Sequence, residues 1–218
     1  MTIPIPPEFS PESFRRRVRE RLPEALPDDA FAPDVWPRAS DFQLNGGKPK
    51  LEWLAKARPA AVLAPIVARE TGLTVLLTQR ASQLRAHSGQ VAFPGGKIDP
   101  GETAKDSALR EAWEEIGLAA EFIEPLGWLD SYLTGTGFRI APLVALVKPG
   151  FVLALNVEEV AEVFETPLAF LMDAANHQLH EREWQGAKRK FYAMPHDGHY
   201  IWGATAGILR NLYEKLSG

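Results

Sequence analysis

Three glutamates, Glu111, Glu114 and Glu115, fall within five consecutive positions of the chain. On a helix, residues three and four positions apart are neighbours, so these carboxylates would share one face. Like charges at that spacing repel each other and destabilise an exposed helix by roughly 0.2–0.5 kcal/mol per pair. Hard divalent cations bind clustered carboxylate oxygens. The cluster therefore predicts a site for Mg²⁺ or Mn²⁺ at Glu111, Glu115 and Glu114.

The helix that must position these glutamates has recognisable ends. Thr103 is followed three residues later by Asp106, which is a capping-box-like start. Gly117 favours the left-handed conformation that ends a helix. An apolar stripe at helical spacing lies between these ends, formed by Ala108, Leu109, Ala112, Trp113 and Ile116. Arg110 is four residues from both Asp106 and Glu114 and can pair with either.

Residues 96–118 resemble the Nudix box at every fixed position of that pattern. The matching residues are Gly96, Glu102, Arg110, Glu111, Ala112, Glu114, Glu115, Gly117 and Leu118. The chain thus resembles Nudix hydrolases, metal-dependent enzymes that cut nucleoside diphosphates linked to a further group. The resemblance implies that Arg110 orients the catalytic glutamates and that Glu102 has a supporting role.

The segment just before the box resembles a second signature, found in the coenzyme A pyrophosphatase branch of the family. The matching positions are Leu76, Leu77, Thr78, Arg80, Ala81, Arg85, Gly89, Phe93, Pro94, Gly95 and Gly96. This resemblance implies hydrolysis of coenzyme A or its thioesters to 3′,5′-ADP and 4′-phosphopantetheine. We expect the substrate-binding residues to be Arg80, Arg85, Thr78, Gly95, Gly96 and Phe93.

The charge pattern favours the same class of ligand. Residues 71–98 contain no Asp or Glu but do contain Arg80, Arg85 and Lys97. Residues 99–124 reverse the balance and are strongly acidic. Arginine binds phosphate oxygens through a bidentate fork. A phosphate-rich substrate held between arginines and metal ions would match both segments.

Nudix enzymes often recruit one more carboxylate from outside the box, as a metal ligand or a general base. The segment that starts at Asn156 resembles the corresponding segment of the coenzyme A branch. We predict Glu159 as the additional catalytic carboxylate, with Glu162 as the alternative. A helix with solvated glutamates is the other interpretation of this stretch.

Composition restricts the class of protein. The chain has 218 residues, with 45% hydrophobic and 24% charged residues, as is usual for a globular protein. The formal charge of −4 provides no basic excess for nucleic acid. With no cysteine, thiolate metal sites and thiol catalysis are excluded. No apolar run is long enough to span a membrane, so we expect a cytoplasmic protein that binds a small molecule.

The pattern of elements predicts an α/β (α+β) fold, a Nudix-type α/β/α sandwich on a mixed β-sheet. We expect an N-terminal helical and irregular extension over residues 1–57, followed by the Nudix hydrolase domain over residues 58–218. Strands are predicted at 60–68, 74–78, 122–132, 140–147, 190–194 and 200–202. Helices are predicted at 11–22, 157–164 and 205–216, with a helical turn at 167–175.

Two other functions remain open from the sequence. One is a Nudix hydrolase for another nucleoside diphosphate derivative, such as ADP-ribose, NADH or a dinucleoside polyphosphate. The other is a non-catalytic nucleotide-binding module, although such proteins usually have a degenerate box and this box is intact. A homodimer in which the N-terminal segment covers a neighbouring chain is also possible.

Overall fold

The computed structural model describes residues 10–47, 50–83, 89–184 and 186–217. A mixed sheet forms its centre, with strands in the order β1-β7-β8-β2-β3-β4, while β5 pairs with β2, β6 with β8 and β9 with β3. The strands of this sheet are β1 (Ala39–Ser40), β2 (Arg58–Arg69), β3 (Gly72–Arg80), β4 (Val91–Ala92), β5 (Gly95–Lys97), β6 (Ile123–Trp128), β7 (Tyr132–Leu133), β8 (Phe138–Val147) and β9 (Val160–Pro167). Because β2 runs parallel to β8 and antiparallel to β3, the predicted mixed sheet is confirmed.

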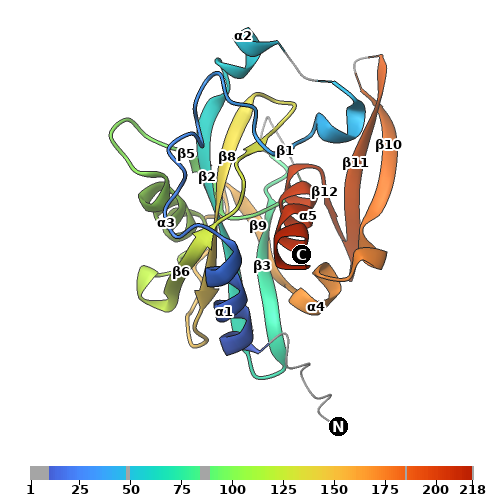
Figure 1. The fold of residues 1–218 in the computed structure, drawn as a ribbon. Helices are drawn as coiled ribbons and strands as arrows, with labels where there is room; N and C mark the ends of the chain where they lie inside the picture. Colours follow the sequence, from blue (N-terminus) through green and yellow to red (C-terminus); the bar gives the residue numbers. More distant parts are fainter. Residues whose placement is uncertain (1–9, 48–49, 84–88, 185, 218) are drawn as a thin grey trace.

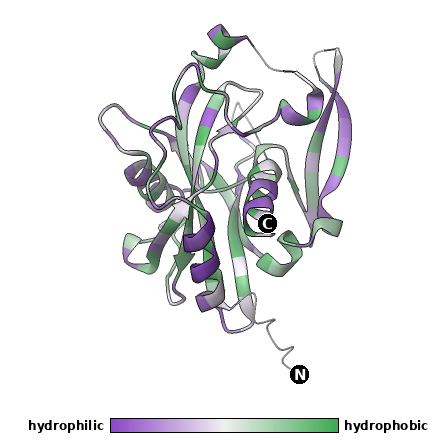
Figure 2. Cartoon of the chain, in the orientation of Figure 1, coloured by the Kyte–Doolittle hydropathy of each residue, from purple (hydrophilic) through white to green (hydrophobic). Residues whose placement is uncertain are grey.

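Helices cover both faces of the sheet, as predicted for a sandwich (Figure 1). The helices are α1 (Pro11–Arg21), α2 (Leu51–Leu54), α3 (Ala104–Ile116), α4 (Leu168–Leu171) and α5 (Ala204–Ser217), with 3₁₀ turns η2 (Gln43–Asn45), η3 (Ala120–Phe122) and η4 (Ala174–Asn176). One hydrophobic core joins the sheet to α1 and α5, and a second joins it to α3. Figure 2 shows hydrophobic residues along the central strands and hydrophilic residues over most of α1.

The N-terminal segment packs on its own chain. Phe14 and Val18 of α1 are buried in the core shared with α5. Further along, β1 pairs in parallel with β7 and so adds a strand to the edge of the sheet. The carboxylate of Asp41, directly after β1, accepts hydrogen bonds from the Tyr132 hydroxyl at 2.7 Å and the Gly135 N–H at 2.6 Å. The described part of the extension is therefore integral to the core, and its expected boundary at residue 57 stays a prediction.

A second, three-stranded sheet lies beside α5. It contains β10 (Gln178–Trp184), β11 (Ala187–His196) and β12 (His199–Trp202), in the order β10-β11-β12. The strands predicted at 190–194 and 200–202 are confirmed as parts of β11 and β12, which form a hairpin around Asp197, and Asp197 has a positive φ of 46°. The side chain of Asn45 in η2 donates to the carbonyl of Lys190 and accepts from its N–H. It therefore covers a part of β11 that does not pair with β12.

The predicted acidic helix over residues 157–164 is wrong. Residues 157–159 form a turn, and the following residues form β9, which pairs antiparallel with β3. Val160, Glu162 and Phe164 lie at the two-residue period of a strand. A single turn of helix, α4, follows at Leu168–Leu171 and is shorter than the turn predicted over 167–175.

Candidate active site

The helix of the Nudix box forms as its ends predict. Thr103 is the N-cap, and its hydroxyl oxygen accepts a hydrogen bond of 3.1 Å from the N–H of Asp106. Gly117 is the C-cap, with a φ of 69°, in the left-handed region that glycine adopts without strain. Between these caps α3 packs Ala108, Ala112 and Ile116 onto the sheet, and this packing fixes the direction of its acidic face.

Glu115 is the most buried of the predicted glutamates. Its side chain is only 4% exposed, and its Oε2 accepts a hydrogen bond of 3.1 Å from the N–H of Gly95. The pKa of Glu115 is raised to about 7, mainly by burial and also by the charges of Glu111 and Glu159, while the hydrogen bond from Gly95 and the charge of Arg80 act in the opposite direction. The protein thus keeps a poorly solvated carboxylate beside other carboxylates, a typical feature of functional sites.

Glu111 lies against Gly96 of β5. Burial also raises the pKa of Glu111, although its hydrogen bond with Arg110 acts in the opposite direction. A Cβ atom at Gly96 would collide with the Glu111 carboxylate, so a larger residue there would have to displace that carboxylate. A Cβ at Gly95 would lie 2.5 Å from the carbonyl oxygen of Ala61 on β2, because β5 and β2 are paired at this point. Close packing against the backbone therefore requires glycine at Gly95, whereas at Gly96 it preserves the position of Glu111.

Arg110 holds three glutamates in place. Its Nε lies 2.8 Å from Glu102, and its Nη1 lies 3.0 Å from Glu111 and 2.9 Å from Glu114. The hydrogen bond from Arg110 lowers the pKa of Glu102 to about 2. Of the two partners predicted for Arg110, Glu114 is confirmed, whereas Asp106 bonds to the Thr103 hydroxyl instead. Glu114 is the most exposed of the four box glutamates, with 53% of its side chain accessible.

Glu159 reaches the same site from a distant part of the chain. The loop before β9 is tied to the end of α3, since the N–H groups of Ala154 and Asn156 donate to the carbonyls of Ile116 and Glu115, both at 2.9 Å. The charge of Glu159 contributes to the raised pKa of Glu111 and of Glu115, after burial as the main cause. The alternative, Glu162, points elsewhere and pairs with His199 at 3.2 Å.

Sequence reasoning gave no role to Asn156 beyond marking the start of a segment. Its backbone joins the loop to Glu115, and its side-chain amide lies 3.4 Å from Glu159. An asparagine just before a turn is a weak signal by itself, because the same residue is common in loops. The sequence contains no pattern that links this loop to α3.

Arg80 at the end of β3 is the predicted substrate-binding arginine that contacts the glutamates. Its Nη1 lies 3.8 Å from Oε1 of Glu115, and 28% of its side chain is exposed. Its Nε–H is buried and has no acceptor among the described residues. An arginine that is partly exposed and has an unused donor can bind a phosphate oxygen. Arg85, the other predicted arginine, lies outside the described residues.

Two predicted substrate residues have structural roles instead. Thr78 is 2% exposed, and its hydroxyl donates to the carbonyl of Ala92 across the β3–β4 pair at 3.2 Å. Phe93 is 4% exposed and packs in the core shared with α5. We therefore revise the substrate-binding prediction for both, because neither side chain presents a surface to a ligand.

The donor set fits a hard divalent cation. Glu111 and Glu115 are poorly solvated carboxylates next to each other and to Glu159, and carboxylate oxygens are the ligands that Mg²⁺ and Mn²⁺ prefer. In the described part of the chain, no three acidic or histidine side chains already converge as a preformed metal cage. In this arrangement Arg110 forms ion pairs with Glu111 and with Glu114.

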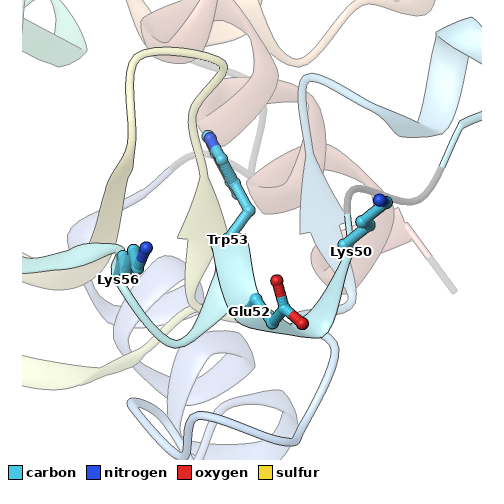
Figure 3. Close-up of a pocket in the computed structure, with 4 residues that line it drawn as sticks. All are labelled: Lys50, Glu52, Trp53 and Lys56. Carbon is cyan, nitrogen blue, oxygen red and sulfur yellow. The ribbon is translucent and has the colours of Figure 1, made fainter.

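A surface hollow elsewhere contains none of these groups. It has a volume of about 320 Å³ and is lined by Lys50, Glu52, Trp53 and Lys56 of the α2 region. Figure 3 shows Lys50 and Lys56 on either side of Glu52. No residue predicted for catalysis lines it, so we do not assign it to the active site.

Comparison with known proteins decides the family. The family model described as NUDIX domain matches residues 57–192, more than half of the chain. The chain belongs to the Nudix family. It is 38% identical to the uncharacterized Nudix hydrolase NudL of Yersinia enterocolitica over 179 residues, which cover 82% of this chain and 91% of that protein. It is 40% identical to NudL of Yersinia pestis over 164 residues, or 75% and 82% of the two chains.

Solved Nudix structures resemble this one in fold. The Nudix hydrolase RenU from M. smegmatis has a TM-score of 0.48 at 21% identity, over 74% of this chain and 86% of its own. An Ap4A hydrolase from C. elegans has a TM-score of 0.45 at 21% identity, over 50% and 80%. These likenesses concern the fold alone. Family membership supports an enzyme that acts on pyrophosphate bonds with a divalent metal ion.

In the described ranges of the chain, no helix combines the length and the apolar character that crossing a bilayer needs.

Proposed function

We propose that this Nudix enzyme hydrolyses the pyrophosphate bond of coenzyme A or its thioesters, giving 3′,5′-ADP and 4′-phosphopantetheine or its acyl form. The observation that carries the proposal is the contact between Arg80 and Glu115 at 3.8 Å. Arg80 belongs to the second signature and Glu115 to the Nudix box, so the two motifs meet at one point of the fold. A substrate with several phosphates would contact both.

Each side chain has a proposed role. Glu111 and Glu115, with Glu114, would hold Mg²⁺ or Mn²⁺, which when bound neutralises the pyrophosphate and lowers the pKa of a water. Glu159 acts as the general base that accepts a proton from the attacking water. Arg80, whose side chain is 28% exposed, binds a phosphate oxygen through its guanidinium. Arg110 keeps the glutamates oriented through its three ion pairs.

We keep the homodimer as a proposal, and light scattering of the purified protein would measure the oligomeric state directly. We also keep the cytoplasmic location as a proposal that cell fractionation would test.

Product analysis by mass spectrometry tests the substrate. The purified protein is incubated with Mg²⁺ or Mn²⁺ and, separately, with coenzyme A, acetyl-coenzyme A, ADP-ribose and NADH. We expect 3′,5′-ADP and a phosphopantetheine product only from the coenzyme A substrates, and no product in the presence of a chelator. Cleavage of ADP-ribose or NADH alone would reject the coenzyme A assignment but keep Nudix chemistry. A protein that binds but cleaves none of these substrates would support the non-catalytic alternative.

A further inference from the structure

Four aromatic rings lie together on one face of the three-stranded sheet. The register pairs His180 with Phe191 and Ala193 with Trp202, so these side chains point to the same side. Ring centroids are 6.0 Å apart for His180 and Phe191, and 5.3 Å apart for Phe191 and Trp202. Tyr200 joins them 6.3 Å from Trp202, and its hydroxyl is 2.7 Å from Nδ1 of His180.

Two arginines complete this face. Arg182 and Arg189 are paired across β10 and β11 and therefore point to the same side as the rings. The guanidinium carbon of Arg182 lies 5.3 Å from the centre of the Trp202 ring, within cation–π range. The Nε–H of Arg189 is buried and finds no acceptor within the described residues. We call His180, Arg182, Arg189, Phe191, Tyr200 and Trp202 the aromatic face.

The carboxylates of the hairpin are on its other side. Glu181 is paired with Lys190, and Glu183 with Lys188, at the alternate positions of the two strands. Glu181 also forms an ion pair of 2.9 Å with Lys188. In this register, the described ionisable residues on the aromatic face are arginine and histidine, so the face attracts anions.

The aromatic face is directed away from the core. The opposite side of the sheet packs on α5, where Met194 and Ile201 are fully buried and Arg210 lies over the Tyr192 ring at 5.4 Å. Tyr200 remains 41% exposed although it is a large aromatic residue. The hairpin lies on the other side of the molecule from α3 (Figure 1). The face is thus separate from the glutamates of the Nudix box.

We propose that the aromatic face is an accessory binding site for a purine nucleotide. The rings offer a stacking surface for a flat base, and stacking on aromatic side chains is a common way to bind one. The guanidinium groups of Arg182 and Arg189 bind the phosphate attached to that base. A single nucleotide matches the small size of the face better than a nucleic-acid strand, which would require a wider basic surface than a chain of net charge −4 provides.

Calorimetric titration of the full chain with AMP tests the site. The experiment is run with a chelator, so that it requires no turnover and does not depend on the proposed activity. We expect saturable AMP binding by the native chain, and about tenfold weaker binding or more for Arg189→Met and for Tyr200→Leu. Adenosine should bind weakly and equally to the native chain and Arg189→Met, because it lacks the phosphate that Arg189 binds.

Lys190→Met is the matched control. It removes the same charge from the neighbouring position of β11, but on the opposite face, so AMP affinity should stay within about twofold of the native value. Thermal unfolding of each variant confirms that it is folded. The absence of saturable AMP binding by the native chain, or unchanged affinity in both Arg189→Met and Tyr200→Leu, would overturn the proposal. Much tighter binding of oligoadenylate than of AMP would overturn it in favour of a strand.

Hydrolysis kinetics of the same variants test whether the face is separate from the active site. We expect unchanged kcat and unchanged KM for coenzyme A together with lost AMP binding, which would support an accessory site. A raised KM for coenzyme A would overturn the accessory role, because the face would then contribute to substrate binding.

Discussion

The backbone N–H of Gly95 donates a hydrogen bond of 3.1 Å to the carboxylate of Glu115. Gly95 belongs to β5 and directly precedes the Nudix box, whereas Glu115 belongs to α3, so one bond joins the start of the loop to the end of the helix that follows it. Among the described residues, Gly95 is the one that donates a hydrogen bond to the Glu115 carboxylate, and the Glu115 side chain is only 4% exposed. Glu115 is consequently held in place but remains under-solvated, which favours binding of a cation.

The first prediction concerns catalysis by Glu115. Glu115→Gln keeps the shape of the side chain and the hydrogen bond from Gly95, but removes the negative charge. We expect turnover to fall on the order of a hundredfold or more, with no change in the circular dichroism spectrum. Glu121→Gln, an exposed position just beyond α3, is the matched control and should keep native activity. Near-native turnover by Glu115→Gln would contradict the assigned role.

The second prediction concerns stability and pH in the metal-free protein. The pKa of Glu115 is raised by burial from 4.5 to about 7, so the folded state binds its proton more tightly than the unfolded state. The free energy of unfolding should therefore fall as pH rises from about 4.5 to about 7, by about 1.4 kcal/mol for each unit of pKa difference. Glu115→Gln removes this dependence, and so should be more stable than the native protein at pH 8 but not at pH 4.

Urea unfolding with a chelator at the two pH values measures that difference. Adding Mg²⁺ at pH 8 should then stabilise the native protein and have little effect on Glu115→Gln, because a ligand that binds only the folded state raises its stability. An equal difference between the two proteins at pH 4 and pH 8 would show that Glu115 titrates normally.

The third prediction concerns Arg110. Arg110→Lys keeps the charge but cannot bond to Glu102, Glu111 and Glu114 together, because lysine lacks the planar fork. We expect activity to fall about tenfold to a hundredfold, the range typical of residues that orient metal ligands. The exposed Lys105 on the same helix supplies the control, since Lys105→Ala should have little effect. Steady-state kinetics over a range of Mg²⁺ concentrations would show the loss as a higher Mg²⁺ concentration needed for half-maximal activity.

The fourth prediction concerns Gly96. A methyl group at this position would collide with the Glu111 carboxylate. Gly96→Ala should displace the Glu111 carboxylate and reduce metal affinity, while the free energy of unfolding stays close to the native value, because the colliding atoms are the end of a flexible side chain. Gly47→Ala is the control, because the nearest atom to its added methyl would be 3.9 Å away. Calorimetric titration with metal measures the affinity and thermal unfolding measures the stability, and equal metal affinity of the two variants would exclude the collision.

Local signals were sufficient where a short segment controls its own structure. The caps of α3 at Thr103 and Gly117, the hairpin at Asp197 and the closing helix α5 all follow from residues within a few positions. The stretch after Asn156 could not be assigned in this way. Its acidic and apolar residues suited a helix as well as a strand, and pairing with β3 selected the strand.

The sequence by itself determined the chemistry: a cluster of glutamates on one helix face, arginines before it and glycines where the loop must turn. Only the tertiary structure decided how these groups are arranged. It buried Glu115, brought Arg80 to it, and brought Glu159 rather than Glu162 toward the cluster. It also placed Thr78 and Phe93 in the interior. The physical reason is that burial and charge–charge contact depend on strand pairing between residues distant in the chain, which no local spacing encodes.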